Sequence, residues 1–164
     1  MTNATNNNAS HPQAIFMMGG PGSGKGYVCS KLYGDSGIQV LDCDSIKAEH
    51  PDYDPKDPAP LHEWSAMELK RRFKTTVANG EDFIYDGTGS NAEKYAAMIK
   101  ECQEMGFETT LVYVQCSLPT ALKRNASRTR VVPEWIVREK HSTIATSFEI
   151  VSRYADTVNT VDND

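Results

Sequence analysis

Short apolar runs alternate with longer amphipathic stretches from residue 14 to residue 161. Short apolar runs are typical of buried strands, whereas apolar positions that recur every three or four residues are typical of helices. Strands and helices in alternation indicate βαβ units, and therefore an α/β fold with a mostly parallel sheet flanked by helices. The predicted strands are residues 14–18, 38–41, 83–85, 110–114 and 157–161, the last from a weak alternation.

Helix signals lie between these strands. Ser90 and Glu93 have the spacing of a capping box, and prolines 119 and 133 stand near two further helix starts. Four prolines between residues 51 and 60 predict a connecting loop. The predicted helices are residues 25–33, 45–49, 62–78, about 90–105, one opening at residues 117–119, and one from 133 to about 154.

The length and composition indicate one domain. The chain has 164 residues, of which 39% are hydrophobic, enough for a single core over residues 14–164. Residues 1–13 are rich in Asn, Thr and Ser, so we expect a disordered tail there. No apolar run approaches the roughly 18 residues of a membrane span, so we expect a cytoplasmic protein with no membrane partner. The four cysteines show no metal-site spacing, and we expect reduced, mostly buried thiols.

A glycine-rich segment joins the first predicted strand to the first predicted helix. Residues 19–26 read GGPGSGKG and fit the pattern G-x-x-x-x-G-K. Such a loop turns successive amides toward one anion, the helix N-terminus adds partial positive charge, and Lys25 adds a full one. We predict a P-loop that binds ATP, or another nucleoside triphosphate, through Gly20, Pro21, Gly22, Ser23, Gly24, Lys25, Gly26 and Tyr27. The alternative is a structural turn that binds nothing.

This loop resembles that of adenylate kinase and the nucleoside monophosphate kinases. Gly26 stands where many P-loops carry the Ser or Thr that touches Mg²⁺, and Tyr27 stands where the resembling kinases have threonine. We therefore expect other groups to hold Mg²⁺.

Acidic side chains follow the second and third predicted strands, at the sheet edge where open α/β folds bind ligands. Asp44 is our candidate for the base that accepts the proton of an attacking hydroxyl, and for a metal ligand. Its alternative role is structural, with Asp44 or Ser45 capping the next helix. Asp86 is the candidate Mg²⁺ ligand and Thr88 a candidate substrate contact; the alternative for both is turn formation.

Three arginines lie around the connector after the fourth predicted strand. Arg124 and Arg128 are four residues apart on one helical face, and Arg130 follows. Guanidinium groups match the oxygens of a transferring phosphoryl group, so we predict a short arginine lid over the nucleotide. A solvated helix face is the alternative.

From residue 14 to about residue 140 the chain resembles the zeta-toxin and polynucleotide 5′-kinase branch of P-loop kinases. The resemblance is carried by the P-loop, Asp42-x-Asp44-x-x-Lys47, Asp86-Gly87-Thr88, Lys123-Arg124-Asn125-x-x-Arg128 and Val132-Pro133. It implies that Asp44 is the general base, that Lys47 contacts acceptor phosphate, and that Arg128 binds the donor phosphates. Residues 51–63 are more similar to zeta-toxin kinases, which implies an acceptor contact for Glu63.

Together these observations predict a kinase that transfers the γ-phosphoryl group of ATP to an acceptor hydroxyl with Mg²⁺. The candidate acceptors are a nucleic-acid 5′-hydroxyl, a hydroxymethylated DNA base, and a hydroxyl of a nucleotide-sugar. The net charge of −5 is unlike that of a tight, non-specific nucleic-acid binder. Two alternatives stay open: a nucleoside monophosphate kinase, which needs no general base, and a nucleotide-binding module without turnover.

Overall fold

The computed structural model describes residues 11–164. It is one five-stranded sheet, entirely parallel, in the order β2-β3-β1-β4-β5. The strands are β1 (Gln13–Met18), β2 (Gln39–Asp42), β3 (Phe83–Asp86), β4 (Glu108–Gln115) and β5 (Thr157–Asp162). The predicted α/β class is confirmed, as is the fifth strand, which pairs with β4 over six residues.

Six α-helices and one 3₁₀ turn connect the strands. They are α2 (Lys25–Tyr33), α3 (Cys43–Ala48), η1 (Ala59–Leu61), α4 (His62–Ala78), α5 (Ala92–Glu104), α6 (Leu118–Ala126) and α7 (Glu134–Val151). The predicted bounds of the first long helix and of the helix after the proline-rich loop are confirmed. The other bounds differ by a few residues.

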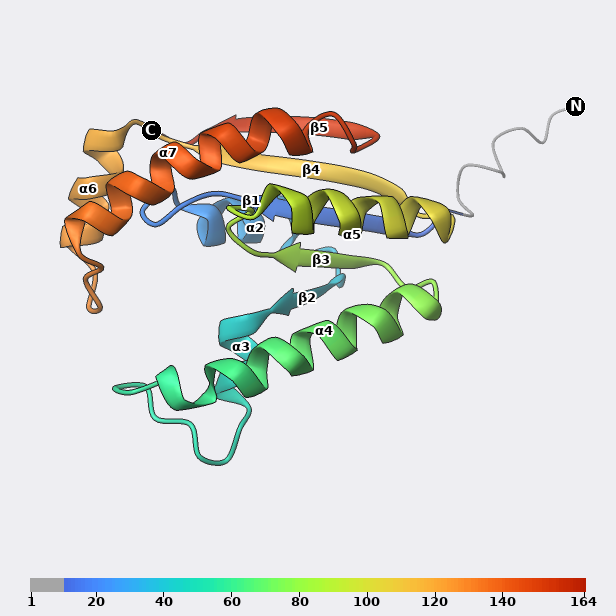
Figure 1. Ribbon diagram of the computed structural model, residues 1–164, viewed down its shortest axis with the longest axis horizontal. Helices are drawn as coiled ribbons and strands as arrows, with labels where there is room; N and C mark the ends of the chain where they lie inside the picture. The colour runs from blue at the N-terminus through green and yellow to red at the C-terminus, as the bar shows by residue number, and fades with distance from the viewer. Residues whose placement is uncertain (1–10) are drawn as a thin grey trace, which may run out of the picture.

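The two faces of the sheet are covered unequally. Helices α4, α5 and α7 lie on one face, and α2 lies on the other (Figure 1). Alternation along β1 sends Phe16 to the first face and Met17 to the second, and both are fully buried. The larger core cluster accordingly lies under α4, α5 and α7, where Phe16, Phe83 and Tyr95 make edge-on aromatic contacts. This core fixes the strand ends that carry the polar residues.

Two predicted helix starts are corrected. The capping box at Ser90 is wrong, because Asn91 caps α5 and its side chain accepts from the Lys94 amide at 3.1 Å. Neither Asp44 nor Ser45 caps α3. Asp42 is the cap, accepting from the Asp44 amide at 3.2 Å and from the Ser45 hydroxyl at 2.8 Å. The side chain of Asp44 is therefore not used for capping.

The start of the domain also differs slightly from the prediction. Gln13, placed in the expected tail, is the first residue of β1, and its amide donates to the Asp82 carboxylate at 2.8 Å. Residues 1–10 of that tail lie outside the described residues. All four cysteines are free; Cys29, Cys102 and Cys116 are buried, and Cys43 is partly exposed. Between residues 11 and 164, no helix is both long and apolar enough to cross a membrane.

Candidate active site

The P-loop occupies the carboxyl end of β1, in the middle of the sheet. Gly22 and Gly24 adopt φ of +81° and +82°, which only glycine takes readily. The loop is closed by a hydrogen bond from the Ser23 amide to the Gly20 carbonyl (3.1 Å) and joined to the neighbouring strand end by one from Gly19 to Thr88 (3.0 Å). The amides of Gly22, Gly24, Lys25 and Gly26 have no acceptor within residues 11–164. These N–H groups, next to the N-terminus of α2, fit a polyphosphate.

A cleft of about 490 Å³ opens over this loop. We call it the first cleft. Its walls are Gly19, Gly20, Pro21, Gly22, Gly24, Lys25, Gly26, Asp44, Thr88, Arg124, Arg128 and Val132. Of the residues predicted to bind the nucleotide, Ser23 and Tyr27 do not line it. Ser23 is buried beneath the loop with its hydroxyl lacking a partner in the described part of the chain, and Tyr27 is 65% exposed.

A second cleft of about 400 Å³ adjoins the first. The two share Lys25, Asp44 and Thr88. Its other walls are Asp42, Cys43, His62, Ala66, Leu69, Tyr85, Asp86, Gly87, Gly89, Ser90, Asn91, Lys94 and Tyr95. The lysine and the carboxylate of Asp44 thus lie at the boundary between two spaces, an arrangement suited to transfer from a group in one to a group in the other.

The sheet register brings the acidic residues to this boundary. Asp86 ends β3 and is paired in register with Asp42 of β2 on one side and with Met17 of β1 on the other. Its carboxylate binds the Lys25 ammonium at 2.5 Å, and both side chains are mostly shielded from solvent. Asp44, in the first turn of α3, is exposed and accepts no hydrogen bond from residues 11–164. One carboxylate is thus held by the P-loop lysine and the other is free toward the clefts.

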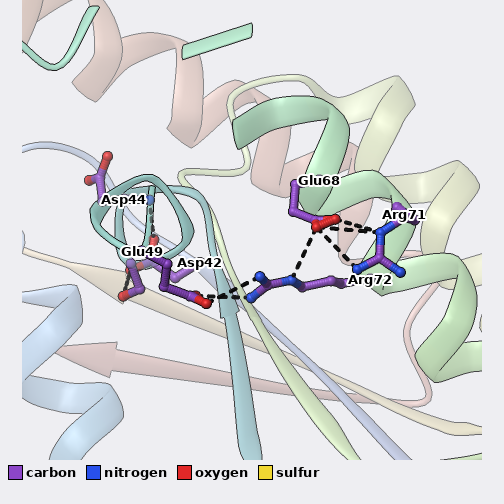
Figure 2. Close-up of polar contacts among 7 residues, drawn as sticks. Asp42, Asp44, Glu49, Glu68, Arg71 and Arg72 are labelled. Atoms are coloured by element: carbon purple, nitrogen blue, oxygen red, sulfur yellow. Dashed lines mark hydrogen bonds and ion pairs between the residues drawn. The ribbon is translucent and has the colours of Figure 1, made fainter. Parts of the chain in front are cut away.

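One ion pair, between Glu49 at the end of α3 and Arg72 of α4, joins the two helices on the side away from Asp44. Arg72 donates to both oxygens of Glu49 at 3.0 and 3.2 Å and lies 3.7 Å from Glu68 (Figure 2). The hydrogen bonds from Arg72 lower the pKa of Glu49. In Figure 2 the Asp44 carboxylate points away from this network. The contacts fix the helix that carries Asp44 without engaging its side chain.

The two arginines of the predicted lid differ in their surroundings. Arg124 donates to the Gly22 and Ser23 carbonyls, both at 3.3 Å, and to the Asn163 carbonyl at 2.6 Å. Arg128 is exposed and makes no ion pair or hydrogen bond with the described residues through its side chain. Both line the first cleft, whereas Arg130 lies outside it. Arg128 is therefore available to a phosphate, and Arg124 already supports the loop.

Two predicted acceptor contacts lie outside both clefts. Lys47 is 6% exposed on the packed side of α3, and Glu63 is exposed in the first turn of α4. In place of Glu63, its neighbour His62 lines the second cleft. Lys94, with its ammonium 6.0 Å from the centre of the Tyr85 ring, was not predicted and lines the same cleft. No sequence motif marks Lys94, because only the packing of α5 brings it there.

A comparison with models of protein families shows to which family the chain belongs. The family model described as Zeta toxin matches residues 1–164. The chain belongs to the zeta toxin family. A zeta-toxin-like protein is an ATP-dependent P-loop kinase, so the chain is a kinase, and ATP binding follows from the family. A search of curated protein sequences found no match.

Solved structures similar to this zeta-toxin-family kinase share its fold at low sequence identity. One, from the PezAT toxin–antitoxin system of Streptococcus pneumoniae, has a TM-score of 0.69 and 14% identity, covering 96% of this chain and 73% of that one. An AvrRxo1-ORF1:-ORF2 complex with ATP gives 0.70 and 16%, covering 91% and 52%. A gluconokinase from Sinorhizobium meliloti gives 0.57 and 15%, covering 92% and 82%. These likenesses support the P-loop kinase fold.

Proposed function

We propose that the kinase transfers the γ-phosphoryl group of ATP from the first cleft to a hydroxyl group held in the second cleft, with Asp44 as general base. The observation that carries this is the position of Asp44 on the wall shared by the two clefts, beside Lys25. An alcohol loses its proton as it attacks phosphorus, and a free carboxylate within reach accepts it. A nucleoside monophosphate kinase needs no such base, because its acceptor is already an anion.

The remaining side chains support charge stabilisation. Lys25 and the free amides of the P-loop would bind the β- and γ-phosphates, and Arg128 would bind the transferring group. Arg124 would add its charge from the wall of the cleft. In this assignment the guanidinium groups offset the negative charge that spreads over the moving phosphoryl oxygens.

The residues at the strand ends fit a magnesium ion. No cluster of three acidic, histidine or cysteine side chains suited to a metal occurs within residues 11–164. Mg²⁺ commonly binds one or two carboxylates and completes its coordination with phosphates and water. Asp86, with Thr88 nearby, would hold it together with phosphate and water oxygens, and the ion would neutralise phosphate charge while Asp44 stays free to accept the proton. The Lys25 ammonium is paired with the Asp86 carboxylate in this structure, and nucleotide binding would draw the ammonium toward the phosphates.

The second cleft favours a small acceptor. A volume of about 400 Å³ is typical of small-molecule sites and too small for a duplex. Its walls offer hydrogen-bonding groups on His62, Asn91 and Ser90, and the ammonium of Lys94, which makes no ion pair with residues 11–164. Of the candidate acceptors, a hydroxyl of a nucleotide-sugar fits these features better than a hydroxymethylated duplex or a polynucleotide end.

Transfer of label from γ-labelled ATP to a panel of acceptors tests the proposal. The panel contains nucleotide-sugars, 5′-hydroxyl oligonucleotides, hydroxymethylated duplexes and nucleoside monophosphates. We expect labelling of a nucleotide-sugar, and a fall in kcat of about 10²- to 10⁴-fold in Asp44→Asn. Asp35→Asn, in the exposed turn after α2 at the opposite edge of the sheet, is the matched control.

Two results would contradict the proposal. Full activity of Asp44→Asn on a nucleoside monophosphate would favour a monophosphate kinase. ATP binding without transfer to any acceptor of the panel would remove the support for a nucleotide-sugar acceptor.

A further inference from the structure

Residue 163, directly after β5, contacts three separate elements of the site. The Asn163 amide donates to the Gln115 carbonyl at the end of β4 (2.8 Å), and its carbonyl accepts from Arg124 of α6 (2.6 Å). Its side-chain Nδ2 donates to the Ser23 carbonyl of the P-loop (2.9 Å). Figure 1 shows the end of the chain beside α6, at the carboxyl edge of the sheet. One residue therefore joins the sheet edge, α6 and the phosphate-binding loop.

The backbone N–H groups and the backbone carbonyls of the P-loop differ in whether they have hydrogen-bond partners. The amides facing the first cleft have no acceptor within the described residues, as noted above. The Gly22 and Ser23 carbonyls, by contrast, have donors: Arg124 donates to both, and Asn163 donates to the Ser23 carbonyl. A phosphate needs converging N–H groups, and a carbonyl oxygen turned into the cleft would repel it. The hydrogen bonds to these two carbonyls therefore keep their oxygens from turning toward a bound phosphate.

The peptide between Ser23 and Gly24 is the one whose rotation would exchange an N–H group for a carbonyl oxygen in the cleft. Gly24 has φ of +82°, and glycine moves between positive and negative φ at little cost. Rotation of this peptide would turn the Ser23 carbonyl toward the cleft and withdraw the Gly24 amide. Of the two donors to that carbonyl, Asn163 makes the shorter bond, at 2.9 Å against 3.3 Å for Arg124, which also serves Gly22.

Close packing supports the same assignment. A Cβ atom at Gly24 would lie 2.1 Å from Asn163 Nδ2. The amide of Asn163 thus lies directly against the backbone that would have to rotate.

We propose that Asn163 is a positioning residue, whose side-chain amide holds the Ser23–Gly24 peptide in the conformation that binds the nucleotide phosphates. This inference rests on ATP being the donor, as in the proposed function. Without the amide, the P-loop populates the rotated conformation, and the apparent affinity falls by the fraction of molecules that remain competent. We expect Asn163→Ala to raise the Kd for ATP about three- to ten-fold, the effect of one lost neutral hydrogen bond.

The experiment measures equilibrium binding to the full chain by displacement of a fluorescent ATP analogue. ATP and inorganic tripolyphosphate are the two competitors. Because the lost contact acts on the phosphate loop, both competitors weaken by the same factor in Asn163→Ala. Asn163→Asp keeps the size of the side chain but replaces the donor with an acceptor, and it weakens binding at least as much. The control variant Asn159→Ala changes an exposed residue of β5, the strand that precedes Asn163, and it binds like the wild type.

The outcomes separate this inference from the proposed function. Wild-type affinity for ATP in both folded Asn163 variants overturns the positioning role and leaves the proposed function intact. Loss of ATP affinity with unchanged tripolyphosphate affinity also overturns it, since Asn163 would then act on the nucleoside. No ATP binding by the wild type refutes the donor assignment, and the inference with it. The thermal unfolding midpoint of each variant, which Asn163→Asp is expected to preserve, shows that the comparison is made on folded protein.

Discussion

The hydroxyl of Tyr95 lies against Gly87, the residue between Asp86 at the end of β3 and Thr88. Tyr95 is 3% exposed, and its hydroxyl donates to the Met17 carbonyl of β1 at 2.8 Å. A Cβ atom at Gly87 would lie 2.6 Å from the Tyr95 oxygen. Gly87 is not among the glycines with positive φ, so its backbone would accept alanine, and the conflict of Gly87→Ala is steric alone.

The size of the effect follows from these contacts. Overpacking a filled site costs about 1–3 kcal/mol of unfolding free energy, which is our expectation for Gly87→Ala. Tyr95→Phe removes one buried hydrogen bond, for a loss of about 1 kcal/mol. In the double variant the closest remaining contacts of the new Cβ are 3.3 Å to Tyr85 and 3.5 Å to the ring of residue 95. The double variant should therefore be about 1–2 kcal/mol more stable than the sum of the single losses.

Urea unfolding of the four proteins, read as midpoint and slope, measures this coupling. Phosphoryl transfer gives a second measurement, because displacing residue 87 moves Asp86 and Thr88; activity should fall in Gly87→Ala and recover partly in the double variant. Gly26→Ala is the control for unfolding, since a Cβ there meets nothing within 4 Å. Strictly additive losses would refute the assignment of the conflict to the tyrosine oxygen.

Four further experiments test the site and the residues around it. Arg124→Ala should lose about 1–2 kcal/mol of stability as well as activity, because the Gly22 and Asn163 carbonyls lose their arginine donor and the Ser23 carbonyl keeps only Asn163. Arg128→Ala should leave the unfolding free energy within about 0.5 kcal/mol and lower kcat about 10²-fold or more; equal stability losses in both would contradict this. Lys25→Ala should abolish most transfer while the protein stays folded, and a fully active variant would exclude its phosphate role. Iodoacetamide should modify Cys43 first, because burial raises the pKa of the Cys102 thiol to about 12; fast modification of native Cys102, read by mass spectrometry, would oppose that.

The sequence predicted an element well where residues at its ends mark the boundary by their own backbone chemistry. Gly24 before α2, and Asn79 and Gly80 after α4, mark helix ends by backbone chemistry that acts within a few residues, and both helices have the predicted bounds. Strand β4 is longer than predicted, because pairing with β1 and β5 extends it to the polar residues Glu108 and Gln115. Such ends depend on neighbours in space, which the hydrophobic pattern does not contain.

The same distinction holds for caps and for site residues. Ser90 and Asn91 are both good caps, and only the position of the chain after β3 selects Asn91. The P-loop, Asp44 and Arg128 were predicted from their residue types and spacing, and the structure brings them together around the first cleft. His62, Lys94 and Asn163 reach the site through the packing of α4, α5 and β5, and their sequence neighbourhoods carry no phosphate- or substrate-binding pattern.

Sheet order explains why so few residues can assemble this site. Strand β3 lies between β1 and β2, so the residue that ends it meets the P-loop lysine on one side and the α3 turn on the other. A chain in which β2 paired directly with β1 would bring Asp42 of β2, in place of Asp86, next to the strand that carries the P-loop, and it would leave Asp86 at the outer edge of the sheet. The crossover from β2 to β3 through α4 therefore determines which carboxylate lies next to the P-loop lysine. It separates the carboxylate held by the lysine from the one left free, and the second cleft lies between α3 and the end of β3 as a result.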